Sequence, residues 1–227
     1  MAIGEVREVG SVAALVDAVE DTEVGTIVLL ERYFSLDRSL VLLRNVTIAA
    51  QAGARAILNA SASAEAPRRV LLVGGAGTVV RLRSVDVTGG FVNGTRAWGG
   101  GARVLGGSTL VLDDCRVRGN AIRQTGGMRW NHRAAGGGIM ISPGATAVLT
   151  GTFVEATEAA SAQGIAEGGG VVNFGTLTAH GSRLVGNAAR SIAGTASGGA
   201  LRNQGAGAAT LTETLVEGNE AASDRGL

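Results

Sequence analysis

The side chains best suited to bind a ligand lie in two stretches, "GGFVNGTRAW" and "AIRQTGGMRWNHRAA". Large rings are scarce elsewhere, because aromatic residues make up only 3% of the chain. The candidate set is Phe91, Arg96, Trp98, Arg123, Met128, Arg129, Trp130, His132 and Arg133. Aromatic rings can stack on sugar faces, and arginine forks can hold a carboxylate or a sulfate. These residue types predict a contact surface for an acidic glycan or a protein partner; the alternative is that both tryptophans merely cover the core.

Catalytic chemistry has weaker support. Glycosidases need two carboxyl groups flanking the scissile bond, and the adjacent pair Asp113–Asp114 is a candidate. Neighbours in a strand point to opposite faces, so this pair can cooperate only where the chain turns. We expect a turn before Cys115 that the aspartates cap, and we assign no catalytic residue.

The chain also has few cysteine and histidine residues that could act as nucleophiles, bases or metal ligands. Cys115 is the only cysteine, which excludes an internal disulfide, and with no histidine near it in sequence we expect a small buried apolar residue rather than a nucleophile. His180 is expected at the surface or in a turn, and two histidines in the whole chain argue against a zinc site. We therefore expect no metal and no cofactor.

A phosphate loop is the other chemistry that a glycine run such as "AGGGIMIS" suggests. A nucleotide-binding loop needs Gly-Lys-Ser/Thr before a helix, or G-x-G-x-x-G between a strand and a helix. Here strand-like residues follow the glycines, and the chain has no lysine. The run needs a structural explanation instead.

The glycine runs belong to a repeat. They begin at Gly99, Gly136, Gly168 and Gly198, which are 37, 32 and 30 residues apart. An apolar-x-x-Asn element recurs in phase with them and ends at Asn120, Asn187 and Asn219, with Thr157 in a degenerate copy. Self-similarity at such a period indicates stacked units. The alternating stretches between these elements predict three short strands per unit, for example 138–141, 146–149 and 152–155.

Units of this kind cannot bury their own apolar face, so stacking in register predicts an all-β fold, a right-handed parallel β-helix with three short strands per coil. Glycine would supply a positive φ and close backbone approach at the corner of each coil. The asparagines would bond to one another from coil to coil. Because the long loops occupy equivalent places in successive coils, we expect the candidate binding residues to lie together on one side.

A helical cap is expected at the N-terminal end. Ser11 is suited to the N-cap of a helix whose apolar positions are Val12, Leu15, Val16 and Val19. Such a helix would shield the open end of the core. We interpret residues 1–227 as a single domain with a cap at 1–25, irregular first coils at 26–98 and regular repeat coils at 99–227.

The pairing of a GG[AG][ILV] element with an apolar-x-x-Asn element resembles the repeat of the chlamydial polymorphic outer membrane proteins, within the pectate-lyase-like group of right-handed β-helices. The start "SVAALVDAVEDTEVGTIVLL" also resembles the capped start of such helices. The resemblance implies a non-enzymatic adhesion or structural module at the cell surface or outside the cell. Alternatives are a polysaccharide-active enzyme, lyase or hydrolase, and a scaffold subunit of a larger assembly.

The charge and hydropathy of the chain argue against two kinds of partner, nucleic acid and the membrane interior. A net charge of +1 without a basic run argues against nucleic acid, and no apolar stretch approaches the roughly 20 residues of a membrane span. The last repeat, "TLVEGNEAASDRGL", carries no capping helix. We therefore expect an exposed apolar end, completed by a longer parent chain, by a partner or by end-to-end self-association.

Overall fold

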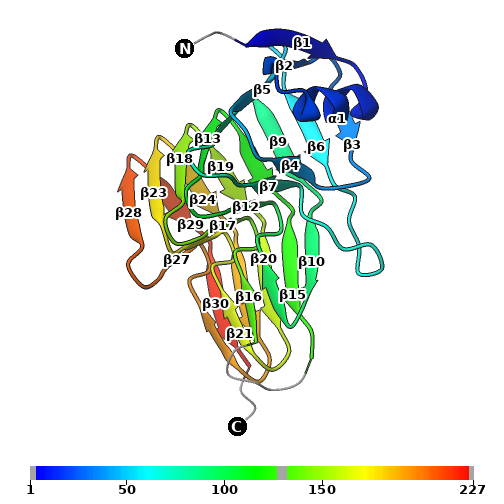
Figure 1. Ribbon diagram of the computed structural model, residues 1–227. Coiled ribbons are helices and arrows are strands. Elements are labelled where there is room, and N and C mark those ends of the chain that lie inside the picture. The colour runs from blue at the N-terminus through cyan, green and yellow to red at the C-terminus, as the bar shows by residue number, and fades with distance from the viewer. Residues whose placement is uncertain (1–3, 127–131, 225–227) are drawn as a thin grey trace.

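The protein is a parallel β-helix in the computed structural model, which describes residues 4–126 and 132–224 (Figure 1). Its strands form five sheets, and neighbouring strands within each sheet are paired in parallel. The all-β fold class and the terminal helix are confirmed. No helix in the described ranges is long and apolar enough to cross a membrane.

Three sheets enclose the main core. Sheet A contains β1 (Glu5–Val9), β2 (Val24–Leu29), β5 (Val46–Ala50), β8 (Val79–Arg83), β13 (Thr109–Asp113), β18 (Thr146–Thr150), β23 (Thr176–His180) and β28 (Ala208–Thr212). Sheet B contains β3 (Tyr33–Ser35), β6 (Ala56–Asn59), β9 (Val85–Thr88), β14 (Arg116–Arg118), β19 (Phe153–Glu155), β24 (Arg183–Val185) and β29 (Leu215–Glu217). Sheet C contains β4 (Leu40–Leu42), β7 (Leu71–Val73), β12 (Ala102–Val104), β17 (Ile139–Ile141), β22 (Val171–Asn173) and β27 (Leu201–Asn203).

Two further sheets form an extension that we call the wing. Sheet D contains β10 (Phe91–Gly94), β15 (Ala121–Gln124), β20 (Glu158–Ser161), β25 (Ala188–Ser191) and β30 (Glu220–Ser223). Sheet E contains β11 (Arg96–Trp98), β16 (Arg133–Ala135), β21 (Ile165–Glu167) and β26 (Thr195–Ser197). In Figure 1 the wing lies below the main stack, and α1 lies at the upper right.

The wing corrects the prediction of three strands per coil. The three predicted strands are present in sheets C, A and B, but the segment expected to be a loop forms two more. The interior of the wing is a thin layer of small apolar residues, including Ala97, Ala134 and Ala159 around Ile122. Alanine has a low intrinsic β-propensity, so these strands give little signal in sequence, and pairing with the neighbouring coils stabilises them instead.

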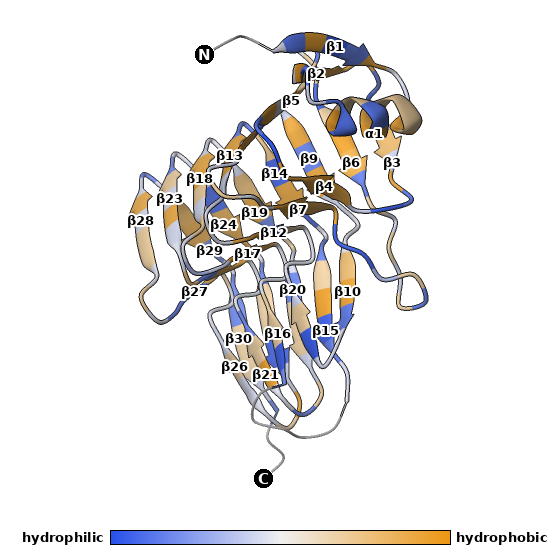
Figure 2. Ribbon diagram, viewed as in Figure 1, coloured by the Kyte–Doolittle hydropathy of each residue, from blue (hydrophilic) through white to orange (hydrophobic). Residues whose placement is uncertain are grey.

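The main core is built from alternating inward-facing residues. Buried valine, leucine and isoleucine from sheets A, B and C form one continuous cluster, and Phe34 is its largest fully buried side chain. Figure 2 shows the hydrophobic residues of β4, β7 and β9 in orange, beside the paler strands of the wing.

Helix α1 (Val12–Glu20) closes the N-terminal end of this core, as predicted. Ser11 caps it, its Oγ accepting a hydrogen bond from the backbone N–H of Ala14 at 3.2 Å, while Leu15 and Val19 are buried. At the other end the Arg44 guanidinium donates to the carbonyls of Ala18 and Val19, which have no partner within the helix. The strand β1 was not anticipated; it adds an edge to sheet A beside β2.

The glycine runs form the corners expected of them. Gly136 has a φ of +74°, which only glycine adopts at little cost. A Cβ on Gly137 would lie 2.4 Å from the carbonyl oxygen of Glu158. A Cβ on Gly138 would lie 2.7 Å from the carbonyl oxygen of Gly170 in the next coil. The first glycine therefore turns the chain, and the next two allow close backbone packing.

The predicted asparagine ladder is present between two coils. Asn187 Nδ2 donates to Asn219 Oδ1 at 2.9 Å, and Asn187 Oδ1 accepts from Thr157 Oγ1 at 2.8 Å. The threonine of the degenerate repeat thus takes the place of an asparagine in the same row. A second ladder, which was not predicted, joins Asn173 Nδ2 to Asn203 Oδ1 at 2.7 Å.

The last coil presents the exposed apolar end that was predicted. Strands β28 and β29 are exposed along their whole length, with Leu215 44% and Val216 49% exposed. What covers this end stays a prediction.

Cys115 is fully buried, as expected, and we predict that its thiol is inert in the folded protein. Burial raises the pKa of the Cys115 thiol to about 12, so at pH 8 roughly one thiol in ten thousand is ionised. A disulfide reagent at pH 8 should therefore label the native protein very slowly and release one equivalent after unfolding in urea. Rapid labelling of the native protein would contradict the buried placement.

Candidate ligand-binding site

The structure divides the predicted contact surface between two faces of the wing. Val92 and Ile122 of sheet D pack against Ala97 and Ala134 of sheet E in its interior. Residues next to them along each strand must therefore point outward, on opposite sides. Phe91 and Arg123 lie on the sheet D side; Arg96, Trp98 and Arg133 lie on the sheet E side, with His132 just before β16. Met128, Arg129 and Trp130 lie outside the described residues.

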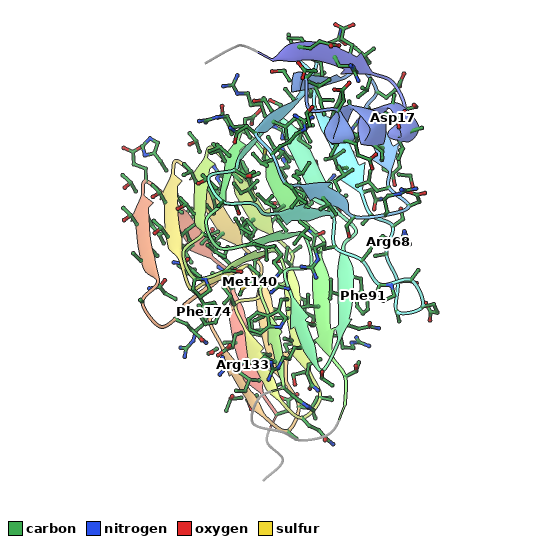
Figure 3. All side chains as sticks on the ribbon, in the orientation of Figure 1. Asp17, Arg68, Phe91, Arg133, Met140 and Phe174 are labelled. Atoms are coloured by element: carbon green, nitrogen blue, oxygen red, sulfur yellow. The ribbon has the colours of Figure 1, made fainter. Side chains whose placement is uncertain are left out.

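The sheet E side meets the outer face of sheet C at an angle, which we call the C–E corner and define by Trp98, Arg103, Met140, Val172 and Phe174. The half-buried Trp98 ring packs with Phe174, their centroids 6.2 Å apart and their planes tilted by 45°. Both residues pack against a small buried cluster formed by Ala135, Met140 and Val172. Figure 3 labels Phe174 and Met140 there, with Arg133 farther along the wing. Trp98 thus covers apolar residues, as the alternative interpretation held, and also leaves part of its ring accessible.

Two arginines beside this corner carry uncompensated charge. The Arg103 guanidinium carbon lies 5.9 Å from the centre of the Trp98 ring. Arg103 Nε and Arg69 Nη1 are buried without a hydrogen-bond partner among the described residues, and neither side chain has an ion pair within that set. Burial, followed by the positive charge of Arg103, lowers the pKa of Arg69 to about 10, so Arg69 remains protonated at pH 7.

Burying unpartnered guanidinium nitrogens is unfavourable, because each loses its hydration without regaining a hydrogen bond. An anion placed between Arg69 and Arg103 would restore bonding and cancel their mutual repulsion. Sequence reasoning missed both residues. Arg103 follows a glycine run in a strand, where only the register decides that it points outward, and Arg69 precedes β7 where later coils have glycine.

Farther along the wing, Arg133 is already paired with a carboxylate. Arg133 Nη1 lies 3.1 Å from Oε2 of Glu167, whose side chain is only 5% exposed. Gln204 Nε2 donates to Glu167 Oε1, and Arg202 Nε lies 3.9 Å from the same oxygen. The predicted binding residue Arg133 is therefore engaged in an internal network, which leaves the Trp98 end of the corner as the receptive part.

The sheet D side carries a different arrangement. Phe91 exchanges two backbone hydrogen bonds with Arg68, at 2.7 and 2.9 Å. Arg123 lines a shallow cavity of about 550 Å³ together with Arg190. Arg190 is bonded to carboxylates on both neighbouring strands, so this face is close to neutral.

Asp114 and His180, which the sequence offered as candidates for catalysis, lie in a turn and at the end of a strand. Asp114 lies in the left-handed region with a φ of +49°, at the turn between β13 and β14, as expected. Its carboxylate accepts from Arg55 at 2.7 Å and from Ser84 Oγ at 2.9 Å. His180 is exposed at the end of β23, with Nε2 3.7 Å from Glu213 Oε2. No group of three histidine, cysteine or acidic side chains suited to a metal occurs among residues 4–126 and 132–224.

Fold and site together define a parallel β-solenoid with a cationic, aromatic corner on its outer surface. Comparisons of the chain with protein-family models, with curated proteins and with solved structures found no match.

Proposed function

We propose that the protein is a non-enzymatic adhesion module, displayed at a cell surface or outside the cell, that binds an acidic glycan at the C–E corner. The observation that carries the proposal is the uncompensated pair Arg69 and Arg103 beside the accessible part of the Trp98 ring. The resemblance of the repeats to those of chlamydial surface proteins, within the pectate-lyase-like group, is in line with it.

The combination of groups favours a glycan over a protein surface. An aromatic ring flanked by guanidinium groups can bind the apolar face of a sugar while the arginines hold its carboxylate or sulfate. The C–E corner runs in the direction in which the coils stack, since Trp98, Ala135 and Glu167 occupy equivalent positions in successive strands. This direction suits an extended polymer.

The test is binding to immobilised polygalacturonate and heparin, with dextran as the neutral probe. We expect Arg103→Gln to weaken binding to the acidic polymers about tenfold, the loss expected for one charge-assisted hydrogen bond. The matched control is Arg81→Gln, which removes the same charge from the exposed outer face of β8. Unfolding curves should show both variants folded.

Equal binding by Arg103→Gln and the parent protein, or equal binding to dextran, would refute the proposal. New chain ends appearing in the polymers during incubation would instead indicate a polysaccharide-cleaving enzyme. Stable co-purification with other proteins, without glycan binding, would favour a scaffold subunit.

A further inference from the structure

A second concentration of arginines lies on the outer face of sheet B, away from the C–E corner. Strand register places one outward residue of each coil in a single row. Its members are Ile57, Asp86, Arg116, Phe153 and Arg183. Arg116 and Arg183 lie over the Phe153 ring, with guanidinium carbons 5.5 and 5.1 Å from its centre. The row therefore passes from Ile57 through the acidic Asp86 to two arginines on either side of an aromatic ring.

Asp86 is the anchor of this region. Its side chain is only 3% exposed although it belongs to the outward row. One carboxylate oxygen lies 3.2 Å from Arg55 Nη1, and the other lies 3.3 Å from Arg118 Nη2. Arg55 also bonds the Asp114 carboxylate at 2.7 Å. These contacts hold Arg55 and Arg118 in fixed positions, which reduces the side-chain entropy that a ligand would otherwise have to remove.

A cavity of about 400 Å³ opens beside Asp86. Its walls combine apolar residues, among them Leu29 and Ala50, with six charged ones, which are Glu31, Arg32, Arg55, Asp86, Arg116 and Arg118. Four arginines thus stand against two carboxylates, and Asp114 at the rim adds a third through its bond to Arg55. The cavity keeps a net positive charge, and its volume is in the range of small-molecule sites.

Two of the arginines are free to receive an anion. In the described part of the chain, Arg32 and Arg116 have no ion pair. Within the same set, Arg116 Nε and Arg118 Nε are buried without a hydrogen-bond partner. We propose that this cavity binds a small organic anion of sugar size, whose carboxylate, sulfate or phosphate group is held by Arg116 and Arg118 while its body contacts Leu29 and Ala50.

The proposal is independent of the glycan site at the C–E corner, because the two share no residue. It is tested by isothermal titration of the whole chain with galacturonate, inorganic sulfate and inorganic phosphate. Binding of galacturonate alone identifies a uronate, and binding of sulfate or phosphate identifies the corresponding ester. Galactose, which lacks the charge, should not bind.

Two variants test the site itself. Arg116→Gln should raise the Kd of the bound anion at least tenfold. Arg183→Gln is the matched control, because it removes an arginine from the other side of Phe153 without touching the cavity, and its Kd should stay unchanged.

The proposal is overturned if none of the three anions binds the parent protein, or if Arg116→Gln and Arg183→Gln behave alike. Arg116→Gln breaks no ion pair in the described structure, so we expect this variant to fold and the test to remain decisive.

Discussion

Replacing Gly137 with alanine should lower the free energy of unfolding by roughly 3 kcal/mol or more, the upper range for overpacking a closed site. The added Cβ would lie 2.4 Å from the carbonyl oxygen of Glu158 and 2.5 Å from that of Gly169. Both obstacles are backbone atoms. Glu158 is the first residue of β20, and the Gly169 carbonyl accepts a hydrogen bond from the Gly138 N–H at 3.2 Å. Neither can retreat without disturbing the hydrogen bonds of the stack.

Urea unfolding monitored by circular dichroism would measure this loss. Gly10→Ala is the matched control, because a Cβ at Gly10 meets no atom within 4 Å and the residue has no positive φ. We expect the control to change stability by less than about 0.5 kcal/mol, as most surface substitutions do. Similar midpoints for the two variants would show that the corner is more compliant than its contacts indicate.

Replacing Asn187 with alanine should cost roughly 3 kcal/mol, because several buried polar groups lose their partners together. The side chain is fully buried, and its amide donates to the Val154 carbonyl and to Asn219, each at 2.9 Å. Its oxygen accepts from the backbone N–H and the hydroxyl of Thr157, at 3.2 and 2.8 Å. All four hydrogen-bonding positions of the amide are in use.

The control for this ladder is Asn187→Thr. The natural Thr157 occupies the equivalent place one coil earlier and donates its hydroxyl hydrogen bond to Asn187, so a threonine fits this row. We expect the threonine variant to lose less than half as much stability as the alanine variant in the same urea experiment. Equal losses would mean that amide shape, rather than hydrogen bonding, stabilises the turn.

The main coils could be predicted because their turns accept only a few residue types, which therefore recur in the sequence. Gly136 needs a positive φ, and Asn187 needs a turn in which its amide can bond along the stack, so both recur in phase. The wing could not be predicted in this way. Its strands pair through backbone groups and pack with alanine, and neither requirement restricts sequence enough to be recognised.

The candidate site was predictable in residue type but not in arrangement. Trp98 was identified because tryptophan is rare in this chain, and the structure places its ring at a cationic corner. Arg103 and Phe174 were missed, since their outward direction depends on the register of sheet C. Arg133 was predicted as a binding residue, and its bond to Glu167, 34 residues away, becomes evident only when the coils are stacked.

The proposed adhesive role would require resistance to mechanical tension, and the Arg44 contact bears on this requirement. Its guanidinium binds the carbonyls of Ala18 and Val19 at the end of α1 and the carbonyl of Val24 at the start of β2. Force applied at the N-terminus would therefore stretch these bonds in parallel, instead of peeling the cap away one bond at a time. A single side chain thus couples the cap mechanically to the first coil and delays detachment under load.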